Sequence, residues 1–304
     1  MYRIMAVILA FVFALAPLEG LQACNADDRA QTNIMKSGLA LPDDQKINMA
    51  ELGGVLAVAV DDCAAVVYDA NFARYLEEAK AGKVEAQDII GLMYAHGAGT
   101  KQSWPDALSW LQKAAAQGSA NASFRLGVIA QYGLAGAADL KAANDHYRKS
   151  SGLGQGFAST NLGVLYLNGL GVAADPKIAF DYFKLAAQQG DAVAYGNMGV
   201  MYMQGLGVQE DPQEAMRMFR AGASMGNPVA MRMLSFGLGR KARAEGNVAG
   251  IKEALMWAML AAKAGDSVAQ KLLDQAKTAL SSDEVAAVQK QADRCKNSQF
   301  KDCN

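Results

Sequence analysis

The stretch "LGVLYLNGLGVAADPKIA", residues 162–179, decides the fold of this chain of 304 residues. It contains the pattern Gly-x-Gly-x-x-Ala from Gly169 to Ala174, which resembles the phosphate-binding loop of dinucleotide-binding folds. Such a loop follows one strand and precedes one long helix, so the pattern is expected only once. Here nearly the same text, "NMGVMYMQGLGVQEDPQEA", occupies residues 197–215, where Gly205 takes the place of Gly169. This recurrence rules out the phosphate-binding loop and indicates an internal repeat.

The repeat has a period of 36 residues and keeps its register over four units. A half unit precedes them, because Gly82 lies one period before Gly118, and a fifth unit ends at Gly265 after three additional residues. A period in this range is typical of a solenoid, in which each unit packs on its neighbours. The columns of small residues that define the period are Gly91, Gly127, Gly163 and Gly199; Gly97, Gly133, Gly169 and Gly205; Ala107, Ala143, Ala179 and Ala215; and Gly118, Gly154, Gly190 and Gly226.

Each unit predicts two antiparallel helices. In the third unit Ala158, Leu162 and Leu165 recur at spacings of four and three, which places them on one helix face. The second helix is expected to start where proline follows the N-cap residue Asp175, and glycines are expected to end both helices. Gly163 stands inside the first helix, where glycine costs about 0.5–1 kcal/mol relative to alanine. Because glycine occupies this column in four units, the sequence predicts a close contact between the two helices of each unit.

The combined pattern of Leu-Gly-x-x-Tyr-x-x-Gly-x-Gly-Val, Asp-Pro-x-x-Ala and a closing Ala-Ala-x-x-Gly resembles the Sel1-like repeat, a relative of the tetratricopeptide repeat. The resemblance implies an all-α, right-handed α-solenoid of about five helix-turn-helix units over residues 70–279, with a cap at each end. The fifth unit departs from the pattern at Ser235 and Leu238. Its three additional residues predict a longer turn between its two helices.

Residues 1–23 are predicted to form a secretory signal peptide. Arg3 supplies a positive charge, residues 4–17 form an apolar run, and "LEGLQA" ends in the small residue Ala23. The apolar run is too short to span a bilayer, and the alternative interpretation is a buried N-terminal helix. The leader predicts export to the periplasm or out of the cell, with no transmembrane span after its removal.

The four cysteines lie outside the repeats, with Cys24 and Cys63 before them and Cys295 and Cys303 after them. Because export permits disulfides, we expect the pairs Cys24–Cys63 and Cys295–Cys303. The first pair lies in an N-terminal segment of residues 24–69, and the second in a C-terminal capping helix and loop of residues 280–304. The alternative is a lipid anchor, since "LQAC" resembles a bacterial lipobox in which Cys24 is lipidated, and this would leave an odd thiol.

The chain carries no recognisable catalytic, metal-binding or cofactor motif. GxSxG, HExxH and CxxC are absent, and the two histidines, His96 and His146, stand alone on predicted helices. The methionines recur at helical spacing, which favours core packing over metal binding. A formal net charge of −1 offers no basic excess for nucleic acid. We therefore expect a non-catalytic protein with no cofactor and no nucleic-acid partner.

We expect the first helices of the repeats to line a concave face and to bind another protein or a peptide there. Asn161 and Asn197 share one column, and side-chain amides both donate to and accept from a peptide backbone. Phe124 and Tyr132 would anchor apolar side chains of the partner. The alternative is a solvated polar face, or asparagines that tie adjacent repeats together. The candidate groove residues are Asp88, His96, Phe124, Arg125, Gln131, Tyr132, Asn161, Asn168, Asn197 and Gln204.

These observations favour an exported, non-catalytic repeat scaffold that mediates protein–protein binding in the bacterial cell envelope. If Cys24 is lipidated, the protein is instead an outer-membrane lipoprotein assembly factor. A third hypothesis is an enzyme that binds cell-wall or β-lactam substrates. That hypothesis rests on the family resemblance alone, because the sequence has no serine–lysine motif to support it.

Overall fold

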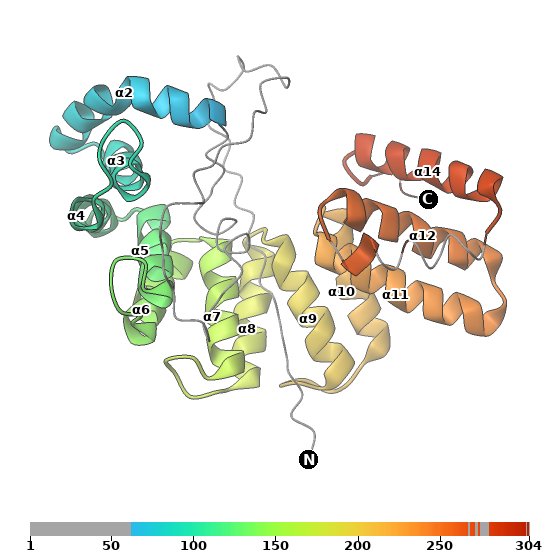
Figure 1. Ribbon diagram of the computed structural model, residues 1–304. Helices are drawn as coiled ribbons and strands as arrows, with labels where there is room; N and C mark the ends of the chain where they lie inside the picture. The colour runs from blue at the N-terminus through green and yellow to red at the C-terminus, as the bar shows by residue number, and fades with distance from the viewer. Residues whose placement is uncertain (1–61, 267, 271–272, 274–279, 302, 304) are drawn as a thin grey trace. The chain divides into compact units, whose positions relative to one another are not determined.

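The computed structural model describes residues 62–266, 268–270, 273, 280–301 and 303, and for residues 62–70 it describes the backbone alone. Every regular element in this part of the chain is an α-helix (Figure 1). The helices are α2 (Asp62–Lys80), α3 (Val84–His96), α4 (Trp104–Ala116), α5 (Ala120–Tyr132), α6 (Leu140–Gly152), α7 (Gly156–Asn168), α8 (Pro176–Gln188), α9 (Ala192–Gln204), α10 (Pro212–Ser224), α11 (Pro228–Glu245), α12 (Val248–Lys263) and α14 (Ser282–Asn297).

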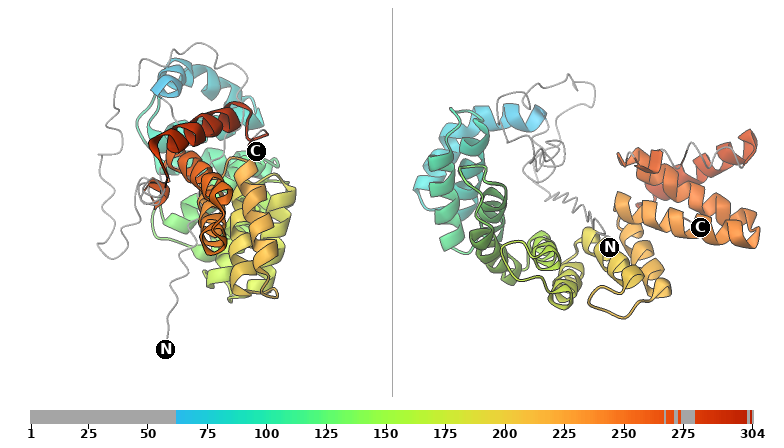
Figure 2. Two further views of the ribbon diagram at one scale, coloured as in Figure 1. Left: turned by 90° about the vertical axis from the view of Figure 1, so that its right-hand side faces the viewer. Right: turned by 60° about the horizontal axis from the view of Figure 1, so that its bottom comes forward.

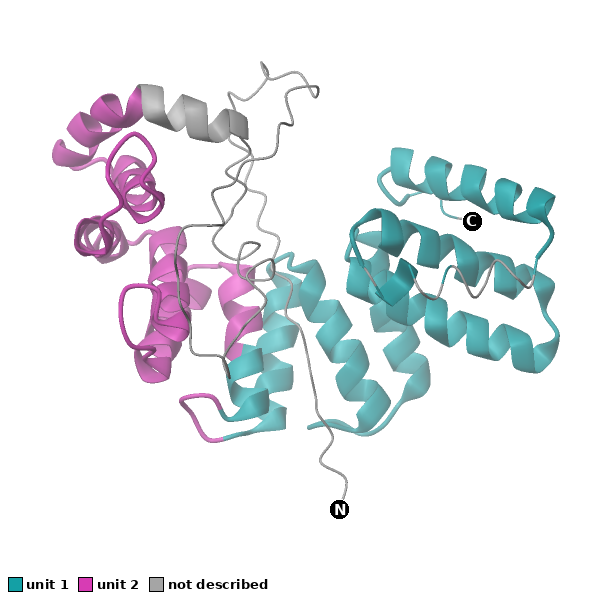
Figure 3. Ribbon diagram, viewed as in Figure 1, with its two compact units in different colours: residues 1–8, 163–169, 174–304 teal, residues 9–162, 170–173 magenta. Residues whose placement is uncertain are grey.

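Helices α3 to α12 form five consecutive pairs, in agreement with the repeat read from the sequence (Figures 1 and 2). The two helices of a pair pack against each other, as in α5 with α6 and α9 with α10. The chain divides into two compact units (Figure 3). One comprises the described residues up to 162 together with 170–173, and the other comprises residues 163–169 and those from 174 onward.

Short polar side chains start most of the described helices, although α3 follows Lys83 without a side-chain cap, and glycines end the first helix of each pair. Asp175 caps α8 by accepting hydrogen bonds from the backbone N–H groups of Lys177 and Ile178, and Asp211 caps α10 in the same way. Proline follows both aspartates, at the first helical position, where its missing N–H leaves no hydrogen bond unmade. The residue after α9 is Gly205, with a φ of 65°, the left-handed conformation that glycine adopts without strain.

The glycine column inside the first helices marks the predicted close contact between paired helices. A Cβ atom added to Gly163 would lie 2.6 Å from the ring of Phe183 on α8, and one added to Gly199 would lie 2.5 Å from the ring of Phe219 on α10. Gly91 and Gly127 meet Leu111 and Tyr147 in the same way. The prediction is confirmed, because a side chain at these positions would overlap the large residue of the partner helix.

The second glycine of the Gly-x-Gly turn contacts the preceding repeat. A Cβ on Gly171 would lie 2.6–2.7 Å from Leu140, the first residue of α6, and one on Gly207 would lie 2.4 Å from Pro176, the first residue of α8. Both glycines also have a left-handed φ, of 70° and 69°. The turn therefore needs glycine twice over, for its own conformation and for its approach to the neighbouring helix.

The fifth pair contradicts the longer turn expected from the sequence. The additional residues lengthen the first helix, since α11 has 18 residues where α9 has 13, and only Gly246 and Asn247 connect it to α12. Lys241 and Arg243 occupy the columns of the two turn glycines, so the helix continues to Gly246, whose φ is 64°. Ser235 replaces the column glycine, and its hydroxyl donates a hydrogen bond of 2.7 Å to the Ala254 carbonyl on α12.

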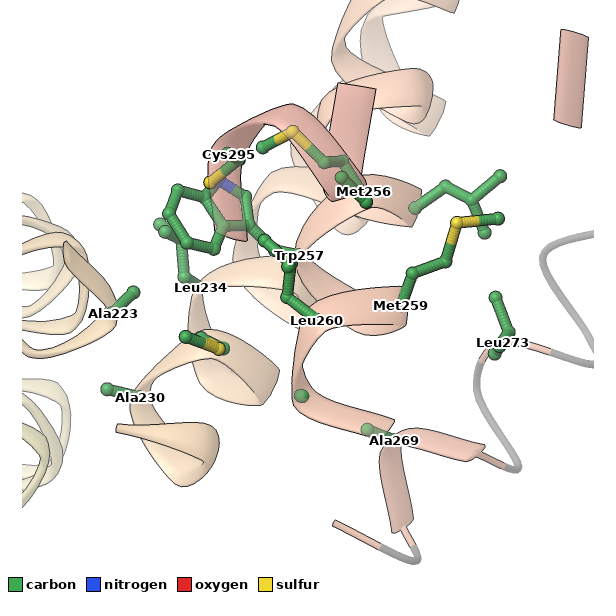
Figure 4. Close-up of a cluster of buried hydrophobic side chains, with 14 of the residues drawn as sticks. Ala223, Ala230, Leu234, Met256, Trp257, Met259, Leu260, Ala269, Leu273 and Cys295 are labelled. Atoms are coloured by element: carbon green, nitrogen blue, oxygen red, sulfur yellow. The ribbon is translucent and has the colours of Figure 1, made fainter. Parts of the chain in front are cut away.

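Helices α2 and α14 flank the array. The ring of Phe72 on α2 packs edge-on against that of Tyr94 on α3, with centroids 5.4 Å apart. The last described helix, α14, packs against α12, and Trp257 and Cys295 both belong to a buried cluster of this unit (Figure 4).

Cys295 and Cys303 form the expected disulfide at this end. In the chain-entropy model, closing a loop of this length stabilises a fold by about 2–3 kcal/mol. The predicted Cys24–Cys63 pair lies outside the described side chains, as does the predicted signal peptide.

Candidate functional site

The face of each first helix that turns away from its partner helix carries residues at spacings of four, three and four. On α9 these are Val193, Asn197, Val200 and Gln204, while Gly199 marks the face that contacts α10. Such spacing keeps side chains on one side of a helix. We call these sets the first-helix stripes. The corresponding residues are Glu85, Ile89, Leu92 and His96 on α3; Asn121, Arg125, Val128 and Tyr132 on α5; Phe157, Asn161, Val164 and Asn168 on α7; and Val229, Met233, Phe236 and Arg240 on α11.

Two of the predicted groove residues, Asp88 and Arg125, bind each other. Arg125 Nη1 donates to Asp88 Oδ2 at 2.7 Å, which joins α3 to α5 across adjacent repeats. Burial raises the pKa of Asp88, and the guanidinium of Arg125 opposes that rise. The other carboxylate oxygen, Oδ1, is buried and has no hydrogen-bond partner among the described residues. The pair therefore links two repeats.

Phe124 and Gln131 also contact the interior of their unit. Phe124 is only 5% exposed, and its ring packs 5.8 Å from that of Tyr147 and 6.3 Å from that of Phe157. Gln131 accepts a hydrogen bond of 2.8 Å from the Tyr147 hydroxyl. His96 and Tyr132, the last residues of α3 and α5, are half-buried. In this unit the predicted groove residues thus mainly join helices to one another.

Asn197 on α9 is different, because its amide is buried and leaves a donor unused. The residue is 5% exposed, and Nδ2 has no hydrogen-bond partner among the described residues. A buried donor left unpaired costs about 1–3 kcal/mol of free energy. Asn197 lies between Val193 and Val200 on its stripe, and both are half-buried.

The remaining predicted residues lie on the same stripes. Asn161 on α7 is 7% exposed, whereas Asn168, at the end of that helix, is exposed and donates a hydrogen bond of 3.0 Å to the Val164 carbonyl. Gln204 is exposed at the end of α9. These positions repeat the columns of Asn197 and Gln204.

Sequence reasoning missed the apolar members of the stripes. Val229 and Met233 on α11 are half-buried, and Phe236 is 52% exposed. The signal was present in the sequence, because steps of four and three from Asn197 reach Val193 and Val200, and one further period reaches Val229 and Phe236. Attention to polar residues alone left these apolar side chains out of the predicted groove.

The described residues contain no cluster of three or more histidine, cysteine, aspartate or glutamate side chains that would hold a metal ion. Nor does any described helix combine the length and apolar character of a membrane span. The first-helix stripes combine apolar side chains, amides and, at Asn197, one unused donor.

A family model described as "Sel1 repeat" matches residues 84–119, 120–155, 157–191, 192–227 and 229–266, which are the five helix pairs. A crystal structure of a Sel1 repeat protein from Oxalobacter formigenes is 28% identical, covers 72% of this chain and 86% of that one, and has a TM-score of 0.61. The crystal structure of c5321, a protective antigen of uropathogenic Escherichia coli with an SLR fold, is 23% identical. It covers 81% of this chain and 62% of its own length, with a TM-score of 0.53. The comparison with curated proteins finds no match.

Proposed function

This chain belongs to the Sel1 repeat family, and from that membership we propose that it is an exported, non-catalytic scaffold that binds an extended segment of another protein in the bacterial cell envelope. Sel1 repeat proteins are generally scaffolds for protein–protein interaction, and their helices form an all-α solenoid. The observation that carries the proposal is the unused amide donor of Asn197.

An extended peptide backbone is the acceptor that suits this amide. A peptide carbonyl placed at Asn197 Nδ2 would pair the buried donor, and the side chains on either side of that carbonyl would reach Val193 and Val200. Asn161 repeats the amide one period earlier in the sequence. Binding by amides and apolar contacts needs no reacting group, which agrees with a scaffold role.

Export is supported by the leader, in which Arg3, an apolar run and a small residue before Cys24 follow the order of a signal peptide. Disulfide bonds form in the oxidising compartments to which such leaders direct proteins, and the Cys295–Cys303 bond suits that location. A lipid on Cys24 is the second candidate, because "LQAC" has the arrangement of a lipobox.

Expression of the whole chain in a Gram-negative host, followed by mass spectrometry of the periplasmic fraction, tests this location. We expect a mature chain that begins at Cys24, with Cys24–Cys63 and Cys295–Cys303 joined and no free thiol among the four cysteines. A diacylglyceryl adduct on Cys24 would transfer the protein to the membrane-anchored form. Recovery of the uncleaved chain in the cytoplasm would contradict export.

A photo-crosslinking residue at position 204 tests binding at the first-helix stripes. Gln204 is exposed at the end of α9, and Gln188, exposed at the end of α8, provides a matched position on a second helix. In irradiated cells we expect a discrete adduct from position 204 and none from position 188. Replacement of Asn197 with alanine should reduce that adduct several-fold, since the change leaves a partner group unpaired.

The same adducts from both positions, or an adduct that survives the alanine replacement, would count against the proposed surface. Circular dichroism of the alanine variant provides the control. If its helix content or melting temperature falls, the amide holds repeats together, and the assignment of Asn197 to the binding surface is wrong.

A further inference from the structure

Helices α9 and α11 pack against each other, so their stripes are neighbours. Together they carry five apolar side chains, which we call the apolar patch: Val193, Val200, Val229, Met233 and Phe236. Val200 and Met233 also pack on the buried cluster of the same unit, whereas Phe236 is 52% exposed. A contiguous apolar patch on a surface can mark a binding site, and aromatic side chains are common anchors at such sites.

Most of the charged residues on the two helices of the apolar patch are cations. Helix α9 has no charged residue, and α11 carries Arg232, Arg240, Lys241 and Arg243, with Glu245 as its last residue and its one carboxylate. Arg232 is neutralised by Asp266 at 2.8 Å, and Arg243 donates to the Gly239 carbonyl. Arg240 and Lys241 are exposed, and neither has an ion-pair partner among the described residues.

Helix α10 of the same unit differs in this respect. On α10, Arg217 pairs with Glu214 on its own helix and Arg220 pairs with Glu253 on α12, so its cations are compensated. The end of α11 therefore carries two uncompensated cations, and Arg240 closes the stripe that contains Phe236.

On the basis of the proposed function, we propose that the apolar patch binds an extended apolar segment whose one end carries carboxylates. The apolar residues of the segment cover Val200, Met233 and Phe236, and one of its carbonyls accepts the unused hydrogen of Asn197. Its carboxylates pair with Arg240 and Lys241. Charge complementarity of this kind sets orientation and partner choice.

Two fluorescent peptides test the proposal on the full mature chain. Both have the same alternating valine–threonine core, and one ends in two aspartates where the other ends in two lysines. We expect the aspartate peptide to bind about tenfold more tightly at low salt. Its two carboxylates form two exposed ion pairs, whereas the two lysines of the other peptide are repelled, and a difference in binding free energy of this size corresponds to about tenfold in affinity. The difference should shrink as salt is added.

Three variants connect binding to the patch. Replacing Phe236 with serine should weaken both peptides by about tenfold or more, as loss of a central aromatic contact does. Replacing Arg240 and Lys241 together with alanine should remove the preference for aspartate while leaving the binding of the lysine peptide nearly unchanged. Ile178→Ser is the matched control, because Ile178 is an exposed apolar residue of the second helix α8, and it should leave both affinities unchanged.

Equal affinity for the two peptides, or equal weakening by Phe236→Ser and Ile178→Ser, would overturn the proposal. So would a dimer in sedimentation that Phe236→Ser abolishes, since the patch then belongs to a second copy of this chain. A photo-crosslink from position 240 to residues 24–61 of the same chain would assign the patch to that segment instead. If neither peptide binds but the adduct at position 204 forms, the scaffold function stands and the partner has a different chemistry.

Discussion

Replacing Phe183 with alanine is expected to lower the free energy of unfolding by about 3–5 kcal/mol, the range for deletion of a buried aromatic side chain. The ring is fully buried and fills the space that Gly163 leaves on α7, so its removal opens a cavity between the helices of the third pair. Urea denaturation followed by circular dichroism measures the change.

Phe180 on the same helix is the control for Phe183. It is half-buried, and the centroid of its ring lies 5.3 Å from that of Tyr202. Phe180→Ala should therefore lower the free energy of unfolding by clearly less than Phe183→Ala. Equal losses for the two variants would show that the contact between ring and glycine has no special weight in the stability of the pair.

Replacing Gly163 with leucine is expected to cost about 1–3 kcal/mol, because the added side chain would overlap a ring that has no free space to enter. The same denaturation experiment measures it. Gly152→Leu is the matched control, since Gly152 is exposed at the end of α6 and a Cβ there meets no atom within 4 Å. That replacement should be neutral or slightly stabilising.

The two changes should also be coupled. In a protein that already carries Phe183→Ala, Gly163→Leu should cost less than in the parent, because the leucine then fills the cavity. Additive losses would show that the two residues do not compete for one space, and the explanation of the glycine column would fail.

The glycine contacts could be predicted from the sequence because glycine recurs at the same column in four repeats. A glycine inside one helix has many explanations, but Gly91, Gly127, Gly163 and Gly199 at one column leave close packing as the common cause. The helix starts were predictable for a similar reason, since Asp-Pro at residues 175–176 and 211–212 encodes a local cap that depends on no distant contact.

The structure of the fifth pair was harder to predict, because the length of an insertion does not show whether it lengthens a helix or a turn. The deciding residues are Lys241 and Arg243, which stand in the columns of the turn glycines and let α11 continue. The absence of glycine at the two turn positions, rather than the number of additional residues, predicts the long helix.

The candidate surface was only partly predictable, because it depends on how neighbouring repeats meet. Asp88 and Arg125 look like free polar ligands in the sequence, and their mutual ion pair appears only when α3 lies beside α5. Phe124 likewise packs on Tyr147 and Phe157, from two other helices. In contrast, the periodicity does place Val193 and Phe236 on the stripe, and an inclusive reading of that face would have found them.

The second turn glycine has a consequence for how such a gene lengthens by duplication. Gly171 and Gly207 fit against the first residues of α6 and α8, and those residues, Leu140 and Pro176, are half-buried, whereas Pro212 at the start of α10 is exposed. A duplicated copy of residues 156–191 inserted next to its parent would bring both halves of this contact with it. A copy added behind the fifth pair would bring its own glycine, but it would find α12 already packed against α14. New units can therefore enter the interior of the array, while its C-terminal end, closed by a disulfide, is inherited as a fixed boundary.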